Sequence, residues 1–263
     1  MKMPDYEKFY LFLLAGQSNM AGRGKVAKMD KIPHPRVLTL TKNNKWVPAA
    51  DPIHFDKECA GVGPGRTFGI TLADKFKNIT IGLIPCAAGG SPISAWRPGQ
   101  KWKQTNSYPY DDAVKRTRQA MKSGVLKGIL WHQGESDCSP EKAKVYEKEL
   151  KDLIRRFRKD LSSPNVPFIP GRLGQCDEPR NSFRKMINKS LLAITKKVKS
   201  TCLVSSDGLR CKRDKIHFDA KSQREFGRRY AAAYMRIMKH PAASRGVFWR
   251  RRIKPKRSNR RPI

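Results

Sequence analysis

A continuous run of large apolar residues near the start of the chain constrains the fold more than any other feature. Residues 9–15 read FYLFLLA and are followed at once by Gly16. An apolar run without alternation is typical of a parallel strand buried on both faces, because helices cover both sides of such a sheet. The run is far too short to span a bilayer. We therefore expect it to form the first and central strand of an α/β domain.

Short apolar segments alternate with helical patterns along the rest of the chain. Further strands are expected at residues 79–85, 128–132, 166–169 and 201–204. The clearest helix is 140–161, where apolar residues recur every three or four positions and Ser136 or Ser139 is placed to cap it. Other helices are expected at residues 113–121, 183–198 and 222–238. This order predicts a single domain, a three-layer α/β/α sandwich with a central parallel sheet, as in flavodoxin-like folds.

The chain is strongly basic, with 56 Lys and Arg against 22 Asp and Glu, a formal charge of +34. Residues 241–263 hold basic residues and no acidic one, so we expect a domain at 1–240 and a disordered basic tail at 241–263. The charge favours association with a polyanion, such as nucleic acid or an acidic glycan. Alternatively, it only suits a polyanion-rich compartment.

Cysteine usage and hydropathy limit the class of protein further. The six cysteines are scattered without a C-x-x-C pair, which argues against structural zinc and favours free thiols, although one disulfide remains possible. No signal peptide or transmembrane helix is apparent. We therefore expect the protein to reside inside a cell or to be packaged in a virus particle in preference to being secreted.

Polar, glycine-rich segments follow the first two long strands, where ligands of such sheets bind. Residues 16–24 read GQSNMAGRG and put Ser18 at the end of the first strand with its N–H at the start of a helical turn. An ordinary capped turn is the alternative. Residues 85–93 read PCAAGGSPI, in which Gly89 and Gly90 allow backbone N–H groups to approach an anionic oxygen, or simply form a tight turn.

Two later segments add acid, base and amide groups. Residues 131–137 read WHQGESD: Gln133 can donate to an oxyanion, and Glu135 can orient a histidine or a loop. In residues 214–219, Asp214 precedes His217 by three positions, so its carboxylate can hold the imidazole Nδ1 while Nε2 faces a serine. Asp219 is better placed to cap the following helix than to act as a catalytic acid.

Together these four segments resemble the SGNH (GDSL-like) hydrolase superfamily, and in particular its sialate O-acetylesterase and carbohydrate esterase family six branch. The blocks G-Q-S-N-M, P-C-A-x-G-G, W-x-Q-G-E-S-D and D-x-x-H occur in that order. The resemblance runs from Gly16 to about Gln223, and residues 63–69 and 94–96 also fit that branch.

The resemblance implies a catalytic set. Ser18 would be the nucleophile and His217 its base, with Asp214 preferred to Glu135 as the third member. The oxyanion would be bound by the N–H of Ser18, an N–H of Gly89 or Gly90, and the side chain of Gln133. Substrate contacts are expected from Gln17, Asn19, Arg66, Trp96 and Arg97. No metal or organic cofactor is implied, because the reaction is acyl transfer to water.

The implied reaction removes O-acetyl groups from carbohydrate, either sialic acid or an acetylated polysaccharide such as xylan, through an acetyl-enzyme. A general or lipid carboxylesterase is one alternative. A polyanion-binding protein that retains the esterase fold is the other.

Overall fold

The computed structural model describes residues 3–176 and 182–239, which contain one six-stranded sheet with strand order β3-β2-β4-β1-β5-β6. The strands are β1 (Phe9–Gly16), β2 (Val37–Leu40), β3 (Trp46–Pro48), β4 (Thr80–Pro85), β5 (Val125–His132) and β6 (Phe168–Pro170). The expected central place of β1 is confirmed. The sheet is mixed and not wholly parallel, because the edge strand β3 runs antiparallel to β2.

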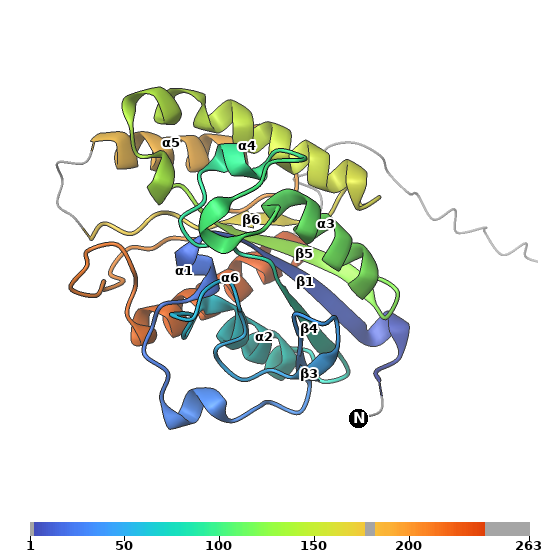
Figure 1. Ribbon diagram of the computed structural model, residues 1–263. Helices are drawn as coiled ribbons and strands as arrows, with labels where there is room; N and C mark the ends of the chain where they lie inside the picture. The colour runs from blue at the N-terminus through green and yellow to red at the C-terminus, as the bar shows by residue number, and fades with distance from the viewer. Residues whose placement is uncertain (1–2, 177–181, 240–263) are drawn as a thin grey trace, which may run out of the picture.

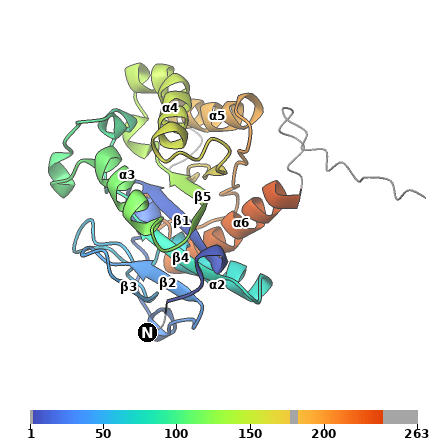
Figure 2. The same ribbon diagram turned by 90° about the vertical axis from the view of Figure 1, so that its right-hand side faces the viewer.

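Helices cover both faces of the sheet, which confirms the three-layer α/β/α architecture (Figures 1 and 2). One layer holds α2 (Pro64–Lys75) and α6 (Ala220–Lys239). The other holds α3 (Pro109–Ala120), α4 (Pro140–Asp160) and α5 (Ser182–Lys197). The short helices are α1 (Ser18–Ala21), η1 (Tyr6–Lys8), η2 (Lys28–Lys31), η3 (Ile93–Trp96), η4 (Lys103–Thr105) and η5 (Glu135–Asp137).

The side chains of β1 explain why its apolar run is unbroken. Phe9, Leu11 and Leu13 are buried in the core beneath α3, α4 and α5, whereas Phe12 and Leu14 are buried against α2 and α6. Successive side chains of a strand point to opposite faces, so a strand covered on both sides must be apolar at every position.

One expected strand is absent, and three elements were not expected, the helix α2 and the strands β2 and β3. Residues 201–204 form no strand and make only isolated bridges, Thr201 to Phe168 and Val204 to Gly171. The helix α2 was not expected, since its glycines at positions 65 and 69 lower its helix propensity. Both glycines pack closely, because a Cβ at Gly69 would lie 2.8 Å from a methyl of Val37.

The boundary expected at residue 240 and the basic tail expected at 241–263 both fall within residues 240–263, which lie outside the described residues. Within residues 3–176 and 182–239, none of the helices combines the length and apolar character needed to cross a bilayer.

The loop after β1 lies at the point where the strand order reverses. From β1 the chain builds β2, β3 and β4 on one side, then crosses to build β5 and β6 on the other. The loops that follow β1, β4 and β5 therefore meet at the carboxyl edge of the sheet, the place where such folds bind ligands.

Candidate active site

Gly16 and the turn after it present Ser18 at the carboxyl end of β1. Gly16 has φ +135°, and a Cβ there would clash with the carbonyl oxygen of His132 on the neighbouring strand. The close approach lets Gln17 N–H donate to that carbonyl (2.9 Å) before α1 begins at Ser18. The Ser18 N–H meets no acceptor in the part of the chain that the structure describes.

Ser18, His217 and Asp214 form one hydrogen-bonded series, although 199 residues separate Ser18 from His217. Ser18 Oγ lies 2.9 Å from His217 Nε2, and His217 Nδ1 lies 2.9 Å from Asp214 Oδ2. The other carboxylate oxygen accepts from the N–H groups of Ile216 (3.0 Å) and His217 (2.9 Å). Burial acts to raise the pKa of Asp214, but these hydrogen bonds outweigh it and lower the pKa to about 2. The carboxylate is therefore charged at neutral pH.

The loop that carries Asp214 and His217 is held by a backbone hydrogen bond within the loop and by a disulfide to Cys176. Lys212 N–H donates to the His217 carbonyl (2.8 Å), and a disulfide joins Cys211 to Cys176. The disulfide corrects the expectation of free thiols. Asp219 Oδ1 accepts from Ser222 N–H (2.7 Å) at the start of α6, which confirms its role as a helix cap.

Asn19 joins three segments that meet beneath Ser18. Its Nδ2 donates to Glu135 Oε1 (2.7 Å) and to the Ile216 carbonyl (3.0 Å), while its Oδ1 accepts from Phe218 N–H (3.0 Å). The side chain is fully buried. Asn19 therefore holds the His217 loop against the end of β1, a position that suits a structural role better than the expected substrate contact.

The carboxylate of Glu135 is hydrogen-bonded to Asn19 and not to His217. Its Oε1 accepts from Asn19, its buried Oε2 has no partner in the described part of the chain, and the nearest imidazole is His132, with Nδ1 3.7 Å from Oε1. Burial lowers the pKa of His132, so this ring is neutral. Of the two acids considered from the sequence, Asp214 is the one that the fold brings to the imidazole of His217.

Gly89 and Gly90 differ in whether their N–H groups are free. The Gly89 N–H donates to Asp56 Oδ2 (3.0 Å), and that carboxylate is held by Arg23 at 2.6 Å in a buried ion pair. Gly90 has φ +76°, and its N–H meets no acceptor among the described residues. Only Gly90 therefore offers a free donor from this pair.

Gln133 is turned inward, contrary to the expectation that it faces an oxyanion. It is fully buried, and the two hydrogens of its Nε2 are shared among three acceptors, the Ser91 carbonyl (3.0 Å), Asp137 Oδ2 and Gln17 Oε1 (3.2 Å). Gln17 thus accepts through its oxygen, while its own Nε2 has no acceptor among the described residues. Gln17 directly precedes Ser18, so its amide is a candidate oxyanion donor that the sequence suggested only as a substrate contact.

The remaining expected substrate contacts are engaged elsewhere. Trp96 is fully buried, donates to Ser91 Oγ (3.0 Å) and packs edge-on against Trp131, so the expected substrate contact is not open to it. Arg66 donates to the backbone carbonyls of Ala49, Met29 and Ile32. Arg97 pairs with Glu149 on α4.

Comparisons with known proteins identify the family of the chain. The family model for carbohydrate esterases described as sialic acid-specific acetylesterases matches residues 8–236. A probable carbohydrate esterase of Arabidopsis thaliana is 33% identical over 247 residues, which cover 86% of this chain and 90% of that protein. Human sialate O-acetylesterase is 33% identical over 86 residues, only 27% of this chain and 16% of that protein.

Solved structures show the same fold. A structure of an Arabidopsis thaliana protein superposes with a TM-score of 0.77 at 30% identity, covering 86% of this chain and 98% of that one. The structure of NanS gives 0.72 at 18% identity, covering 91% of this chain and 100% of its own. Because the family model spans most of its length, the chain belongs to the carbohydrate esterase family of sialic acid-specific acetylesterases.

Proposed function

We propose that this chain is a serine esterase that removes O-acetyl groups from carbohydrate, with Ser18 as nucleophile, His217 as base and Asp214 as the acid that orients it. The observation that supports the proposal is the series Ser18 Oγ, His217 Nε2, His217 Nδ1 and Asp214 Oδ2, with both contacts at 2.9 Å. Nucleophile, base and orienting acid in hydrogen-bond contact are the arrangement that acyl transfer requires.

In the first half of the reaction, His217 Nε2 takes the Ser18 proton while Oγ forms a bond to the acetyl carbonyl carbon. The negative charge that develops on the carbonyl oxygen is stabilised by the free N–H groups of Ser18 and Gly90 and by the Nε2 amide of Gln17. Collapse breaks the bond to the sugar oxygen, which receives the proton from His217. Water, deprotonated by the same histidine, then releases acetate from Ser18.

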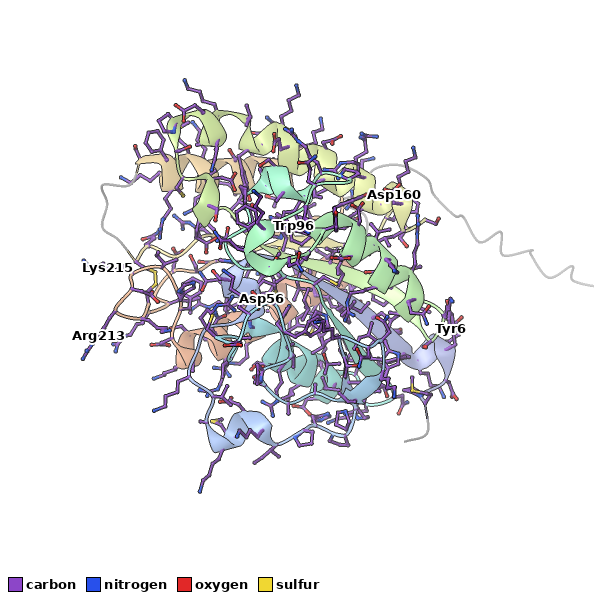
Figure 3. The ribbon with its side chains drawn as sticks, viewed as in Figure 1. Tyr6, Asp56, Trp96, Asp160, Arg213 and Lys215 are labelled. Atoms are coloured by element: carbon purple, nitrogen blue, oxygen red, sulfur yellow. A yellow bond between two sulfur atoms is a disulfide. The ribbon has the colours of Figure 1, made fainter. Side chains whose placement is uncertain are left out.

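The cations around the His217 loop favour an anionic sugar as substrate. Lys212, Arg213 and Lys215 belong to this loop, and Figure 3 shows Arg213 and Lys215 pointing outward from it. Of the two substrate classes considered, an O-acetylated sialic acid carries a carboxylate that these side chains can attract, whereas an acetylated xylan backbone does not. We therefore propose O-acetylated acidic sugars as the preferred substrates.

The test is hydrolysis of p-nitrophenyl esters of increasing acyl length by the wild type and by Ser18→Ala. We expect acetate to be the best acyl group and the Ser18→Ala variant to be inactive. A preference for long acyl chains would favour the alternative of a lipid or general carboxylesterase. A wild type no faster than Ser18→Ala would leave a binding protein with an esterase fold as the better account.

The charge of +34 supports a second, compatible property, association with a polyanion. Such a protein suits a compartment rich in polyanions, inside a cell or a virus particle, and recovery of the protein free in the medium would contradict this. Binding to heparin or DNA that does not weaken with salt would contradict an electrostatic origin.

A further inference from the structure

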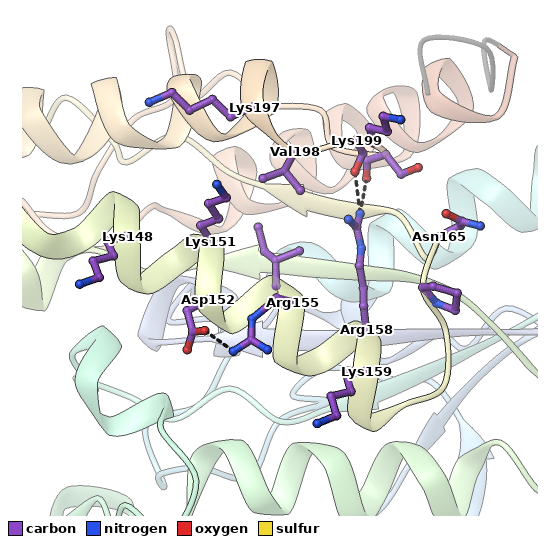
Figure 4. A pocket seen from close by; sticks show the side chains of 13 residues that line it. Lys148, Lys151, Asp152, Arg155, Arg158, Lys159, Asn165, Lys197, Val198 and Lys199 are labelled. Atoms are coloured by element: carbon purple, nitrogen blue, oxygen red, sulfur yellow. Dashed lines mark hydrogen bonds and ion pairs between the residues drawn. The ribbon is translucent and has the colours of Figure 1, made fainter. Parts of the chain in front are cut away.

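A groove of about 840 Å³ lies between α4 and the end of α5 (Figure 4). One wall is the exposed side of α4 from Lys148 to Lys159, and the other is formed by residues 197–200. Residues 164–165 close one end.

The lining of this groove is strongly cationic. Seven of its side chains are Lys or Arg and only one, Asp152, is acidic. Asp152 is already neutralised, because it accepts from Arg155 (2.7 Å) and from Arg156 (2.9 Å) on its own helix. The carboxylate therefore does little to offset the positive charge of the groove.

Three lysines of the groove are available to a ligand. Lys148, Lys151 and Lys159 are exposed and make no ion pair or hydrogen bond within residues 3–176 and 182–239. Arg158 has another task, since it donates to the carbonyls of Val166 (3.1 Å) and Lys199 (2.7 Å) and so fixes the two walls (Figure 4). The groove thus combines a rigid frame with unpaired charges.

The groove is separate from the esterase site. Residues 165 and 200 precede β6 and the Thr201 bridge, so the groove opens at the amino ends of the strands, while Ser18 and His217 lie at the carboxyl ends. The helix α4, 21 residues and about 31 Å long, runs from one edge to the other. A polymer in the groove would leave the esterase site open, so the groove is not a subsite for the reacting sugar.

We propose that this groove binds the phosphate backbone of nucleic acid. Lys148 and Lys159 are about 16 Å apart along α4 at 1.5 Å per residue. Along one strand of a duplex the phosphates are about 3.4 Å apart on the axis, so roughly five phosphates of that strand pass along this wall. A polysaccharide with one carboxylate per sugar or fewer presents fewer charges over that length and matches the groove less well. The proposal rests on the polyanion association above and is independent of the esterase activity.

The test compares two triple variants of the full chain that lose equal charge. Lys148→Gln, Lys151→Gln and Lys159→Gln together alter the groove, and Gln has nearly the helix propensity of Lys, so α4 is retained. The matched control is Lys25→Gln, Lys28→Gln and Lys31→Gln, three exposed lysines in and beside η2. This segment lies on the side of the molecule that holds α2 and α6 (Figure 1). Binding of a short DNA duplex is measured over a range of salt concentrations, alongside polygalacturonate as a carboxylate polymer.

We expect the groove variant to bind DNA at least about tenfold more weakly, with the slope of log K against log salt reduced by about three, one per lost phosphate contact. The control should keep the wild-type slope within about one, and DNA-bound wild type should hydrolyse p-nitrophenyl acetate at its normal rate. Equal losses of DNA affinity in the two variants would overturn the proposal that the groove is the binding site. Tighter binding of polygalacturonate than of DNA would overturn the choice of nucleic acid. A wild type that binds neither polymer would overturn the polyanion association itself, whatever its esterase activity.

Discussion

Replacing Asp214 by Asn should abolish most of the activity, while replacing Glu135 by Gln should not. In Asp214→Asn, the side-chain oxygen must stay on the two N–H groups of Ile216 and His217, so the new NH₂ faces His217 Nδ1. A donor at that place forces the ring proton onto Nε2, which can then no longer accept the proton of Ser18. In serine hydrolases this wrong tautomer lowers kcat about 10⁴-fold, or about 5 kcal/mol of transition-state stabilisation.

In Glu135→Gln, the amide oxygen can still accept from Asn19, and the new NH₂ takes the position of an oxygen that has no partner. The change weakens one charge-assisted hydrogen bond of a positioning residue, so we expect a loss of no more than about tenfold. The two variants should therefore differ by about 10³ in kcat for p-nitrophenyl acetate.

The assay is steady-state hydrolysis at neutral pH, with thermal unfolding of each variant as the control for folding. A Glu135→Gln variant that is folded and as slow as Asp214→Asn would refute the reasoning, because Glu135 would then act on His217 directly. An Asp214→Asn variant with nearly full activity would refute it as well.

Three other outcomes follow from the described contacts. Trp96→Ala should lower the free energy of unfolding in urea by about 3–5 kcal/mol, because it empties a core position, and leave the KM of the folded fraction unchanged; a raised KM at unchanged stability would speak for a sugar contact. Burial lowers the pKa of His54 to about 4, so the unfolded chain takes up a proton that the folded chain excludes. The free energy of unfolding should then fall by about 3 kcal/mol between pH 6.5 and pH 4, and His54→Gln, measured by urea titration, should lack this part of the pH dependence. Reducing the disulfide between Cys176 and Cys211, which are 35 residues apart in the sequence, should lower the free energy of unfolding by up to about 4 kcal/mol and lower both Tm and kcat. The double variant Cys176→Ser with Cys211→Ser should be insensitive to reductant. Equal sensitivity of the two proteins would mean that other thiols are responsible.

Much of the fold was predictable because buried strands and helices each require a local pattern of apolar residues in the sequence. The unbroken apolar run of β1 and the apolar stripe of α4 each identify their element, and α4 ends at Asp160, one residue before the predicted end. The antiparallel pairing of β3 was not predicted, since a three-residue edge strand carries too few positions to show a pattern.

The series Ser18, His217 and Asp214 was predictable only from the four polar segments taken together, whose order resembles that of a known esterase family, because no single segment identifies its residues as catalytic. The surroundings of the site were not. Whether the N–H of Gly89 is free depends on Asp56, which reaches it from 33 positions earlier in the chain. The burial of Trp96 likewise depends on packing against Trp131, which no local pattern around residue 96 reveals.

The most direct measurement of the central claim is the release of acetate from an O-acetylated sialic acid by the wild type and by Ser18→Ala, followed by proton NMR. The account predicts steady release by the wild type and a loss of about 10⁴-fold or more in Ser18→Ala, because no other group replaces the nucleophile. Release at equal rates by the two proteins would contradict it.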